Sequence, residues 1–216
     1  MEARIESLEI SIQIAVLVVC GIVALARMRS PREKSWLLLF AFYGSFLLGD
    51  LYWQVCLLAY GGIPQISLVS DLSWYAALLF LYLLLRTAGE TGKSEGSAAA
   101  APIKKVLPWL APIFTAAMAV FYIRQGKVFS NIVYAGLMGL LLYEAVKGLL
   151  AACRGKGSSR SLHRMVFLFC VLEYALWTVS YFWDLPAFPY IYFGIDLLIT
   201  LSFPFYLSII KREVQS

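Results

Sequence analysis

Seven long apolar runs divide the sequence, and each approaches the roughly 20 residues that a helix needs to cross a bilayer. Lipid offers no hydrogen bonds, so every backbone N–H and C=O of a span must be paired within the protein, and a helix does this alone. The strands of a membrane barrel would be about ten residues long and would alternate in polarity. The sequence therefore predicts an all-α polytopic membrane protein whose seven transmembrane helices cover residues 10–26, 36–59, 66–85, 106–123, 132–152, 162–182 and 190–210.

The composition agrees with this architecture and excludes several other classes of protein. Of the 216 residues, 61% are hydrophobic and 14% are charged, whereas soluble domains average about 45–50% and about 25%. A soluble globular enzyme, a disordered chain and a nucleic-acid-binding domain are therefore excluded. The spans leave almost no sequence for a separate soluble domain, so the lipid bilayer is the expected partner of most of the surface.

Basic residues are gathered in alternate loops and predict the orientation of the chain. The loops after the first, third and fifth spans, together with the C-terminal tail, hold 14 of the 18 lysines and arginines. The opposite set of loops holds only Arg4, Arg124 and Lys127. Positively charged loops stay in the cytoplasm, so we expect the N-terminus outside, the C-terminus inside and the chain in the plasma (inner) membrane. The net charge of +5 is thus an orientation signal and does not indicate nucleic acid.

An internal similarity relates the first three spans to the last three. When the chain is shifted by 125 positions, Pro64 meets Pro189 and Asp71 meets Asp196. This pattern predicts two three-helix repeats, residues 1–86 and 128–216, joined by residues 87–127, which hold a cytoplasmic linker and the fourth span. Because the first and fifth spans run in the same direction, this 3+1+3 arrangement is a parallel repeat about an axis along the membrane normal.

Acidic residues inside the spans are the candidate binding residues, because an ionisable group in a bilayer is costly and is usually functional or paired. Asp50 and Asp71 lie in the first repeat, and Glu173 and Asp196 lie in the second. The rise of about 1.5 Å per residue places the three aspartates in the outer part of the membrane and Glu173 near its middle. We expect these four carboxylates to converge on a cavity that opens outward. The alternative is that each one hydrogen-bonds to Ser or Tyr on a neighbouring helix and only holds the bundle together.

Three tryptophans lie within about a turn of these carboxylates, namely Trp53, Trp74 and Trp177. An aromatic box beside carboxylates is suited to an organic cation, which the ring faces attract. Tryptophans also gather at the level of the lipid headgroups regardless of function, so an interfacial belt is the alternative.

The remaining polar residues give no catalytic or cofactor site. His163 is the only histidine, which excludes a multi-histidine metal centre, and we expect it at the cytoplasmic surface. We assign no catalytic residue and no cofactor. Whether the carboxylates hold a metal ion is left open, since a hard cation accepts oxygen ligands alone. Glu144 and Lys147 lie three positions apart, which predicts an ion pair on one helix face.

Three functions are compatible with these residues. The first is a carrier that binds a cationic or proton-coupled small solute at the carboxylates and aromatic rings. The second is a seven-helix ligand-sensing or partner-binding protein, with either a partner protein or a second copy of the chain. The third is a lipid-active membrane enzyme that uses paired carboxylates as acid and base. The sequence favours the first function and disfavours an enzyme, because no catalytic motif is recognisable.

Overall fold

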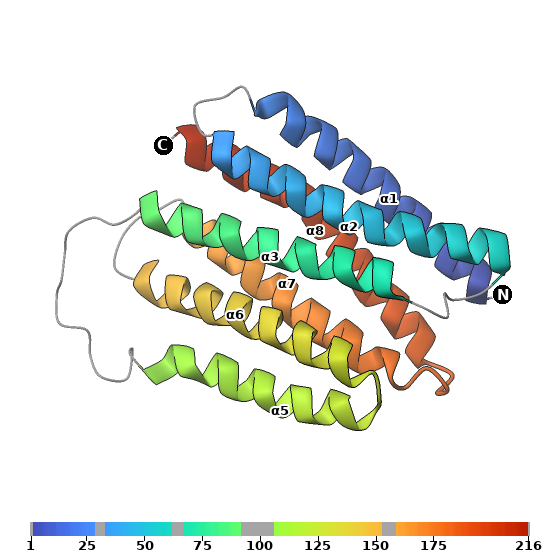
Figure 1. Cartoon of the computed structure of the whole chain (residues 1–216). Coiled ribbons are helices and arrows are strands. Elements are labelled where there is room, and N and C mark those ends of the chain that lie inside the picture. The colour runs from blue at the N-terminus through green and yellow to red at the C-terminus, as the bar shows by residue number, and fades with distance from the viewer. Residues whose placement is uncertain (1, 29–32, 62–66, 92–105, 153–158, 216) are drawn as a thin grey trace.

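The structure is a computed structural model, and it describes residues 2–28, 33–61, 67–91, 106–152 and 159–215. Over these residues the chain is helical (Figure 1). The helices are α1 (Glu2–Arg27), α2 (Glu33–Tyr60), α3 (Leu68–Thr91), α5 (Leu110–Arg124), α6 (Val128–Ala152), α7 (Ser159–Ser180) and α8 (Phe188–Gln215), and the 3₁₀ turn η1 (Leu107–Trp109) precedes α5. Seven segments are long and apolar enough to cross a membrane, which confirms the predicted all-α architecture and indicates an integral membrane protein.

The bundle is built from contacts between consecutive helices and is closed by two further contacts. α1 packs on α2 and α2 on α3, while α6 packs on α7 and α7 on α8. These two groups of three helices meet through α1 against α8 and through α3 against α6. Smaller contacts join α2 to α8 and α3 to α7. α5 packs on α6 at the edge of the bundle (Figure 1).

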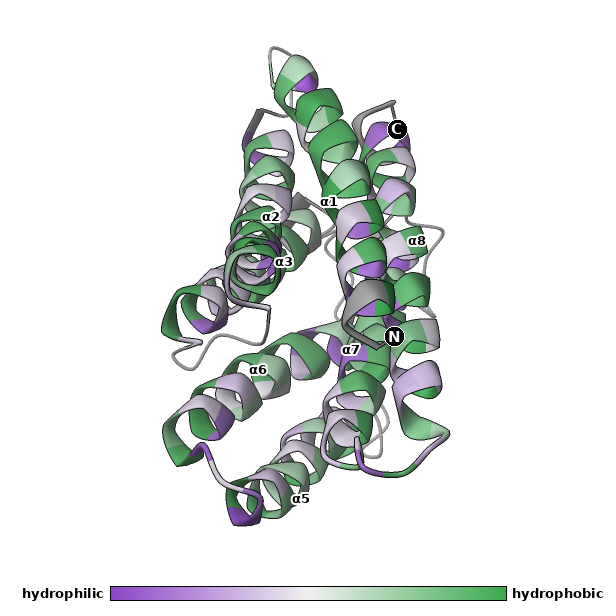
Figure 2. Ribbon diagram, turned by 90° about the vertical axis from the view of Figure 1, so that its right-hand side faces the viewer, coloured by the Kyte–Doolittle hydropathy of each residue, from purple (hydrophilic) through white to green (hydrophobic). Residues whose placement is uncertain are grey.

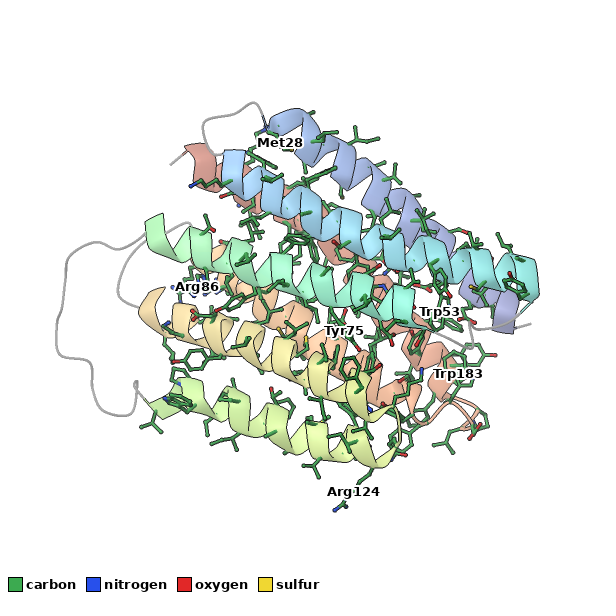
Figure 3. The ribbon with its side chains drawn as sticks, in the orientation of Figure 1. Met28, Trp53, Tyr75, Arg86, Arg124 and Trp183 are labelled. Atoms are coloured by element: carbon green, nitrogen blue, oxygen red, sulfur yellow. The ribbon has the colours of Figure 1, made fainter. Side chains whose placement is uncertain are left out.

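The two ends of the bundle carry different side chains. Figure 3 shows Trp53 and Trp183 at one end, here called the tryptophan end, and Arg86 at the other. The end that holds Arg86 also holds the end of α8, with Lys211 and Arg212, and is called the basic end. α1 begins at the tryptophan end and α8 finishes at the basic end, as an odd number of spans requires (Figure 1).

A layer of aromatic side chains fills the centre of the bundle. Phe42 of α2 makes edge-to-face contacts with Phe169 of α7 and Phe203 of α8, with ring centroids 6.1 Å and 5.8 Å apart. Tyr43 donates a hydrogen bond of 2.7 Å to the backbone carbonyl of Phe203. Phe42 lies eight residues, or about 12 Å, before Asp50 along α2. The packed layer therefore separates Asp50 from the basic end.

Two local features differ from the sequence predictions, and one agrees. α1 begins at Glu2 rather than at residue 10, so it is longer than the apolar run. His163 was expected at the surface but is buried against α6, where a side chain on Gly148 would collide with the imidazole ring. The predicted ion pair is confirmed, with Lys147 Nζ 3.2 Å from Glu144 Oε1. Pro64 and residues 92–105 of the predicted linker lie outside the described residues.

Candidate functional site

Four carboxylates from four helices lie together in the half of the bundle near the tryptophan end. They are Glu9 of α1, Asp50 of α2, Glu173 of α7 and Asp196 of α8, and we call them the carboxylate cluster. Asp196 interacts electrostatically with each of the other three, and Asp50 interacts also with Glu9 and Glu173. Each of the four side chains is at most 8% exposed. The structure therefore brings together three of the four predicted carboxylates and adds Glu9.

The contact between α1 and α8 is polar at the level of the cluster. Gln13 Nε2 donates to Asp196 Oδ1 at 3.1 Å and to Thr200 Oγ1 at 2.9 Å. The carboxyl groups of Glu9 and Asp196 also interact electrostatically with each other. Two carboxylates in such a position repel each other when both are charged. Figure 2 shows the hydrophilic positions that interrupt the apolar ribbons of α1 and α8.

Asp50 is held by a tryptophan from the next helix. Trp74 Nε1 of α3 donates to Asp50 Oδ1 at 3.1 Å, and Trp53 Nε1 donates to Glu6 Oε1 at 3.0 Å. The two tryptophan rings lie 5.6 Å apart with their planes at 41°. Gly49 makes room for this arrangement, since a Cβ at that position would lie 2.5 Å from Trp74 Nε1. Two of the three predicted tryptophans are thus bonded to carboxylates.

The cluster has unmet hydrogen-bonding capacity. Glu9 Oε1 and Asp50 Oδ2 are buried and have no hydrogen-bond donor among the described residues. In the same part of the chain, no lysine or arginine forms an ion pair with any of the four carboxylates. An unpaired buried polar oxygen costs about 1–3 kcal/mol, and more when it is charged. The arrangement therefore suits a proton or a cationic ligand that supplies the missing donors or charge.

Asp71, the fourth predicted carboxylate, has a different set of neighbours. Asp71 Oδ2 accepts hydrogen bonds of 3.0 Å from Ser67, which directly precedes α3, and from Ser130 of α6. Tyr75, one turn further along α3, donates to the backbone carbonyl of Ser130 at 3.0 Å. These bonds tie α3 to α6, which is the structural role that we weighed as the alternative for each carboxylate.

Trp177, the third predicted tryptophan, lies beside Glu173 but is bonded elsewhere. Its ring stacks on Tyr134 with centroids 4.3 Å apart and planes at 12°, and Tyr134 donates to Glu173 Oε2 at 3.5 Å. Trp177 Nε1 and the Tyr181 hydroxyl donate to Asn131 Oδ1 at 3.2 Å and 3.1 Å. Trp177 thus supports the wall of the site through Tyr134, and its N–H group is committed to Asn131.

A tyrosine from α8 forms the rim of the cluster. Tyr192 lies one turn before Asp196, is half-buried and interacts electrostatically with Asp196, Glu9 and Glu173. Trp183, at the tryptophan end in Figure 3, packs edge-on against Tyr192 with ring centroids 5.3 Å apart. Aromatic side chains therefore lie between the carboxylates and this end of the bundle.

Sequence reasoning missed Glu9 and Gln13, because the acidic start of the chain reads as a polar tail before an apolar run. The signal was present in the spacing of Glu6, Glu9 and Gln13, which are three and four residues apart. Such spacing places side chains on one face of a helix. Extending the helical period backward from Gln13 would have added both residues to the candidate site.

Among the described residues, no three His, Cys, Asp or Glu side chains are arranged to hold a metal ion. Comparisons with protein-family models, curated proteins and solved structures find no match to this chain. Function is therefore inferred from the chemistry of a buried acidic site in a seven-helix integral membrane protein.

Proposed function

We propose that this chain is a small membrane carrier that binds a cationic or proton-coupled small solute at the carboxylate cluster. The observation that carries the proposal is the convergence of two carboxylates from each three-helix group, Glu9 and Asp50 from one and Glu173 and Asp196 from the other. Two of their oxygens are buried without a donor in the described structure. A proton or a bound cation relieves that deficit, and exchange between the two couples solute movement to a proton gradient.

The paired tryptophans add a surface for an organic cation. The N–H groups of Trp53 and Trp74 are bonded to Glu6 and Asp50, so the ring faces are what remains for a ligand. Ring faces attract organic cations by about 0.5–2 kcal/mol, depending on how dry the site is. Carboxylates and tryptophan rings together therefore favour an organic cation over an anion or a neutral sugar.

The contacts between helices support the predicted parallel repeat. In such a repeat α1, α2 and α3 correspond to α6, α7 and α8. The contact of α1 with α8 then corresponds to that of α6 with α3, and the contact of α2 with α8 to that of α7 with α3. All four contacts are present. Asp71 and Asp196 occupy matching places in this correspondence. Asp71 accepts from Ser130 on α6, and Asp196 accepts from Gln13 on α1. The carboxylate cluster then lies where two repeats meet, which is where carriers built from repeats bind their solutes.

The proposed orientation places the tryptophan end outside and the basic end in the cytoplasm of the plasma (inner) membrane. The test uses single cysteines in a background where Cys153 is replaced by Ser, because Cys20, Cys56 and Cys170 are buried. In intact cells a membrane-impermeant maleimide should label Asp184→Cys and should leave Arg212→Cys unlabelled until the cells are opened. The opposite pattern would reverse the orientation.

The binding test measures proton release from purified protein in weakly buffered detergent. Four organic cations serve as probes: tetraphenylphosphonium, ethidium, choline and spermidine. A probe that replaces a proton at the cluster should acidify the solution, and the release should disappear in Asp50→Asn and in Asp196→Asn. Asp71→Asn is the matched control, because this aspartate is bonded to two serines outside the cluster and its loss should leave proton release intact.

Transport is tested with the same variants in liposomes that have an acidic interior. Wild-type protein should accumulate the probe that releases protons, and Asp50→Asn and Asp196→Asn should abolish accumulation. No proton release and no accumulation with any of the four probes would contradict the proposal. Binding that depends on the cluster without accumulation would favour the ligand-sensing alternative, and conversion of added lipid that is lost in Asp50→Asn would favour the enzyme.

A further inference from the structure

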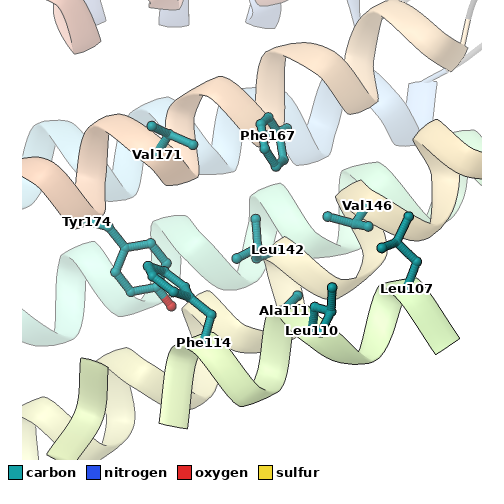
Figure 4. A pocket seen from close by; sticks show the side chains of 9 residues that line it. All are labelled: Leu107, Leu110, Ala111, Phe114, Leu142, Val146, Phe167, Val171 and Tyr174. Carbon is teal, nitrogen blue, oxygen red and sulfur yellow. The ribbon is translucent and has the colours of Figure 1, made fainter. Parts of the chain in front are cut away.

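An apolar groove of about 450 Å³ lies on the side of the bundle between α5 and α7, with α6 as its floor (Figure 4). This volume lies within the range of about 300–1,000 Å³ that holds small ligands in proteins. The side chains that form its walls and floor are Leu110, Phe114, Leu142, Val146, Phe167 and Val171. Leu110, Phe114 and Val171 are each about half exposed, at 55%, 46% and 47%. The groove therefore opens sideways, where the membrane-spanning part of the chain faces lipid.

The groove is closed toward the tryptophan end by contacts between its two walls. The hydroxyl groups of Thr115 on α5 and Tyr174 on α7 lie 2.6 Å apart in a hydrogen bond. The rings of Phe114 and Tyr174 meet edge to face with centroids 5.2 Å apart. Tyr122 continues this junction about two turns further along α5 with a hydrogen bond of 2.9 Å to Thr178. A linear ligand in the groove would thus extend from this junction toward the basic end.

Two arginines continue the α7 wall of the groove at the basic end. Arg160 and Arg164 precede Phe167 and Val171 at spacings of four, three and four residues, which places all four on one face of the helix. Arg160 Nε is buried and has no acceptor among the described residues, and the Arg164 side chain is exposed. Lys147 lies at the same end but is already paired with Glu144 at 3.2 Å. The groove is therefore apolar along its length and cationic at one end.

We infer that this groove binds one acyl chain of an anionic phospholipid, whose phosphate lies at Arg160 and Arg164. The guanidinium group is the side chain best matched to phosphate oxygens, and it tolerates a half-buried site because it is weakly hydrated. Arg164 lies one turn deeper than Arg160, about 6 Å, and its long stem lets the charged group reach the headgroup level. Each buried methylene of the acyl chain adds to binding, while the unpartnered Arg160 Nε selects an anionic headgroup.

The test compares lipid retention by native mass spectrometry. Protein is equilibrated in bicelles with equal amounts of phosphatidylglycerol and phosphatidylcholine, and the lipid that stays bound is identified. Wild-type protein should retain phosphatidylglycerol, and Arg160→Gln/Arg164→Gln should retain about thirtyfold less, as expected for the loss of two interfacial cations. Lys211→Gln/Arg212→Gln removes the same charge at the same end of the bundle, away from the groove, and should retain the lipid.

A second variant tests the groove separately from the charges. Val171 is 47% exposed, so Val171→Trp can be accommodated while its ring fills the groove, and retained phosphatidylglycerol should fall although both arginines are present. Helix content by circular dichroism and a monodisperse elution profile establish that each variant is folded. If the double variant does not fold, the single variant Arg164→Gln, at an exposed position, decides, with an expected loss of about fivefold. Three results would each overturn the inference. The wild-type protein could retain both lipids equally, the Val171→Trp and arginine variants could retain as much phosphatidylglycerol as the wild type, or the Lys211/Arg212 control could lose as much as the Arg160/Arg164 variant.

Discussion

Replacing Gly49 by alanine tests whether the Trp74 ring packs against the backbone of α2 and donates its N–H to Asp50. A Cβ at position 49 would lie 2.5 Å from Trp74 Nε1 and 2.8 Å from Trp74 Cδ1, so the indole must move. Gly44 lies on the same helix five residues earlier, and a Cβ there would meet nothing within 4 Å. The two substitutions therefore make the same chemical change in two different surroundings.

The expected effects have opposite signs. Alanine is favoured over glycine in a helix by about 1 kcal/mol, so Gly44→Ala should raise the free energy of unfolding by up to that amount. At Gly49 this gain is outweighed, because overpacking costs about 1–3 kcal/mol. The lost hydrogen bond between Trp74 and Asp50 adds about 1.5–3 kcal/mol when the acceptor is charged. Gly49→Ala should therefore destabilise the protein by about 2–5 kcal/mol.

The measurement is equilibrium unfolding in mixed micelles with increasing sodium dodecyl sulfate, followed by circular dichroism. The double variant Gly49→Ala/Trp74→Phe completes a mutant cycle, because phenylalanine is smaller than tryptophan and cannot make the bond to Asp50. Its loss of stability should be smaller than the sum of the two single losses. If Gly49→Ala is as stable as Gly44→Ala, Trp74 does not occupy the space beside Gly49 and the arrangement around Asp50 is wrong.

Three further predictions concern hydrogen bonds and ion pairs in other parts of the bundle. Thr115→Val removes the hydrogen bond to Tyr174 with almost no change in shape and should cost about 1 kcal/mol of unfolding free energy in the same assay, with Thr115→Ser as the control that keeps the hydroxyl. Asn131→Ala removes an amide that bonds two backbone carbonyls, an indole and a hydroxyl. It should cost about 3 kcal/mol or more, and a loss below 1 kcal/mol would show that the hydrogen bonds are not formed. Glu144→Gln breaks the ion pair with Lys147. Because this lysine is 54% exposed, the free energy of unfolding should change by no more than about 0.5 kcal/mol in the same assay.

The sequence was sufficient to predict the seven spans, because a span is recognised by its apolar composition and its length is set by the thickness of the bilayer. It also predicted that Asp50, Glu173 and Asp196 lie within the spans, since a carboxylate within an apolar run is visible without knowing its neighbours. Their partners were not visible. Asp71 lies with the same kind of apolar residues as Asp196, but its two serine donors include Ser130, which is distant in sequence. Whether a buried carboxylate joins a cluster or bonds to serines depends on the rotation of neighbouring helices, which hydropathy does not encode.

Close packing between helices was the other feature that the sequence could not specify. His163 appeared to belong to the surface because basic residues flank it, yet the absence of a side chain at Gly148 admits its ring against α6. Glu9 appeared to precede the first span, yet α1 begins at Glu2, so that Glu9 is part of this helix and interacts with Asp196. In both cases a local polarity signal was overridden by a contact with another helix, which is α6 for His163 and α8 for Glu9.

The contacts between the two groups of three helices, α1–α3 and α6–α8, have a consequence for how the protein can be assembled. The first three helices reach the last three through contacts along α1 with α8 and along α3 with α6, and the covalent connection runs only through the segment between α3 and α6. Transmembrane helices insert individually and associate afterward. A gene cut within the codons for residues 92–105 should therefore yield two polypeptides that recombine in the bilayer. The covalent link would then act chiefly by keeping the two pieces at a high effective concentration.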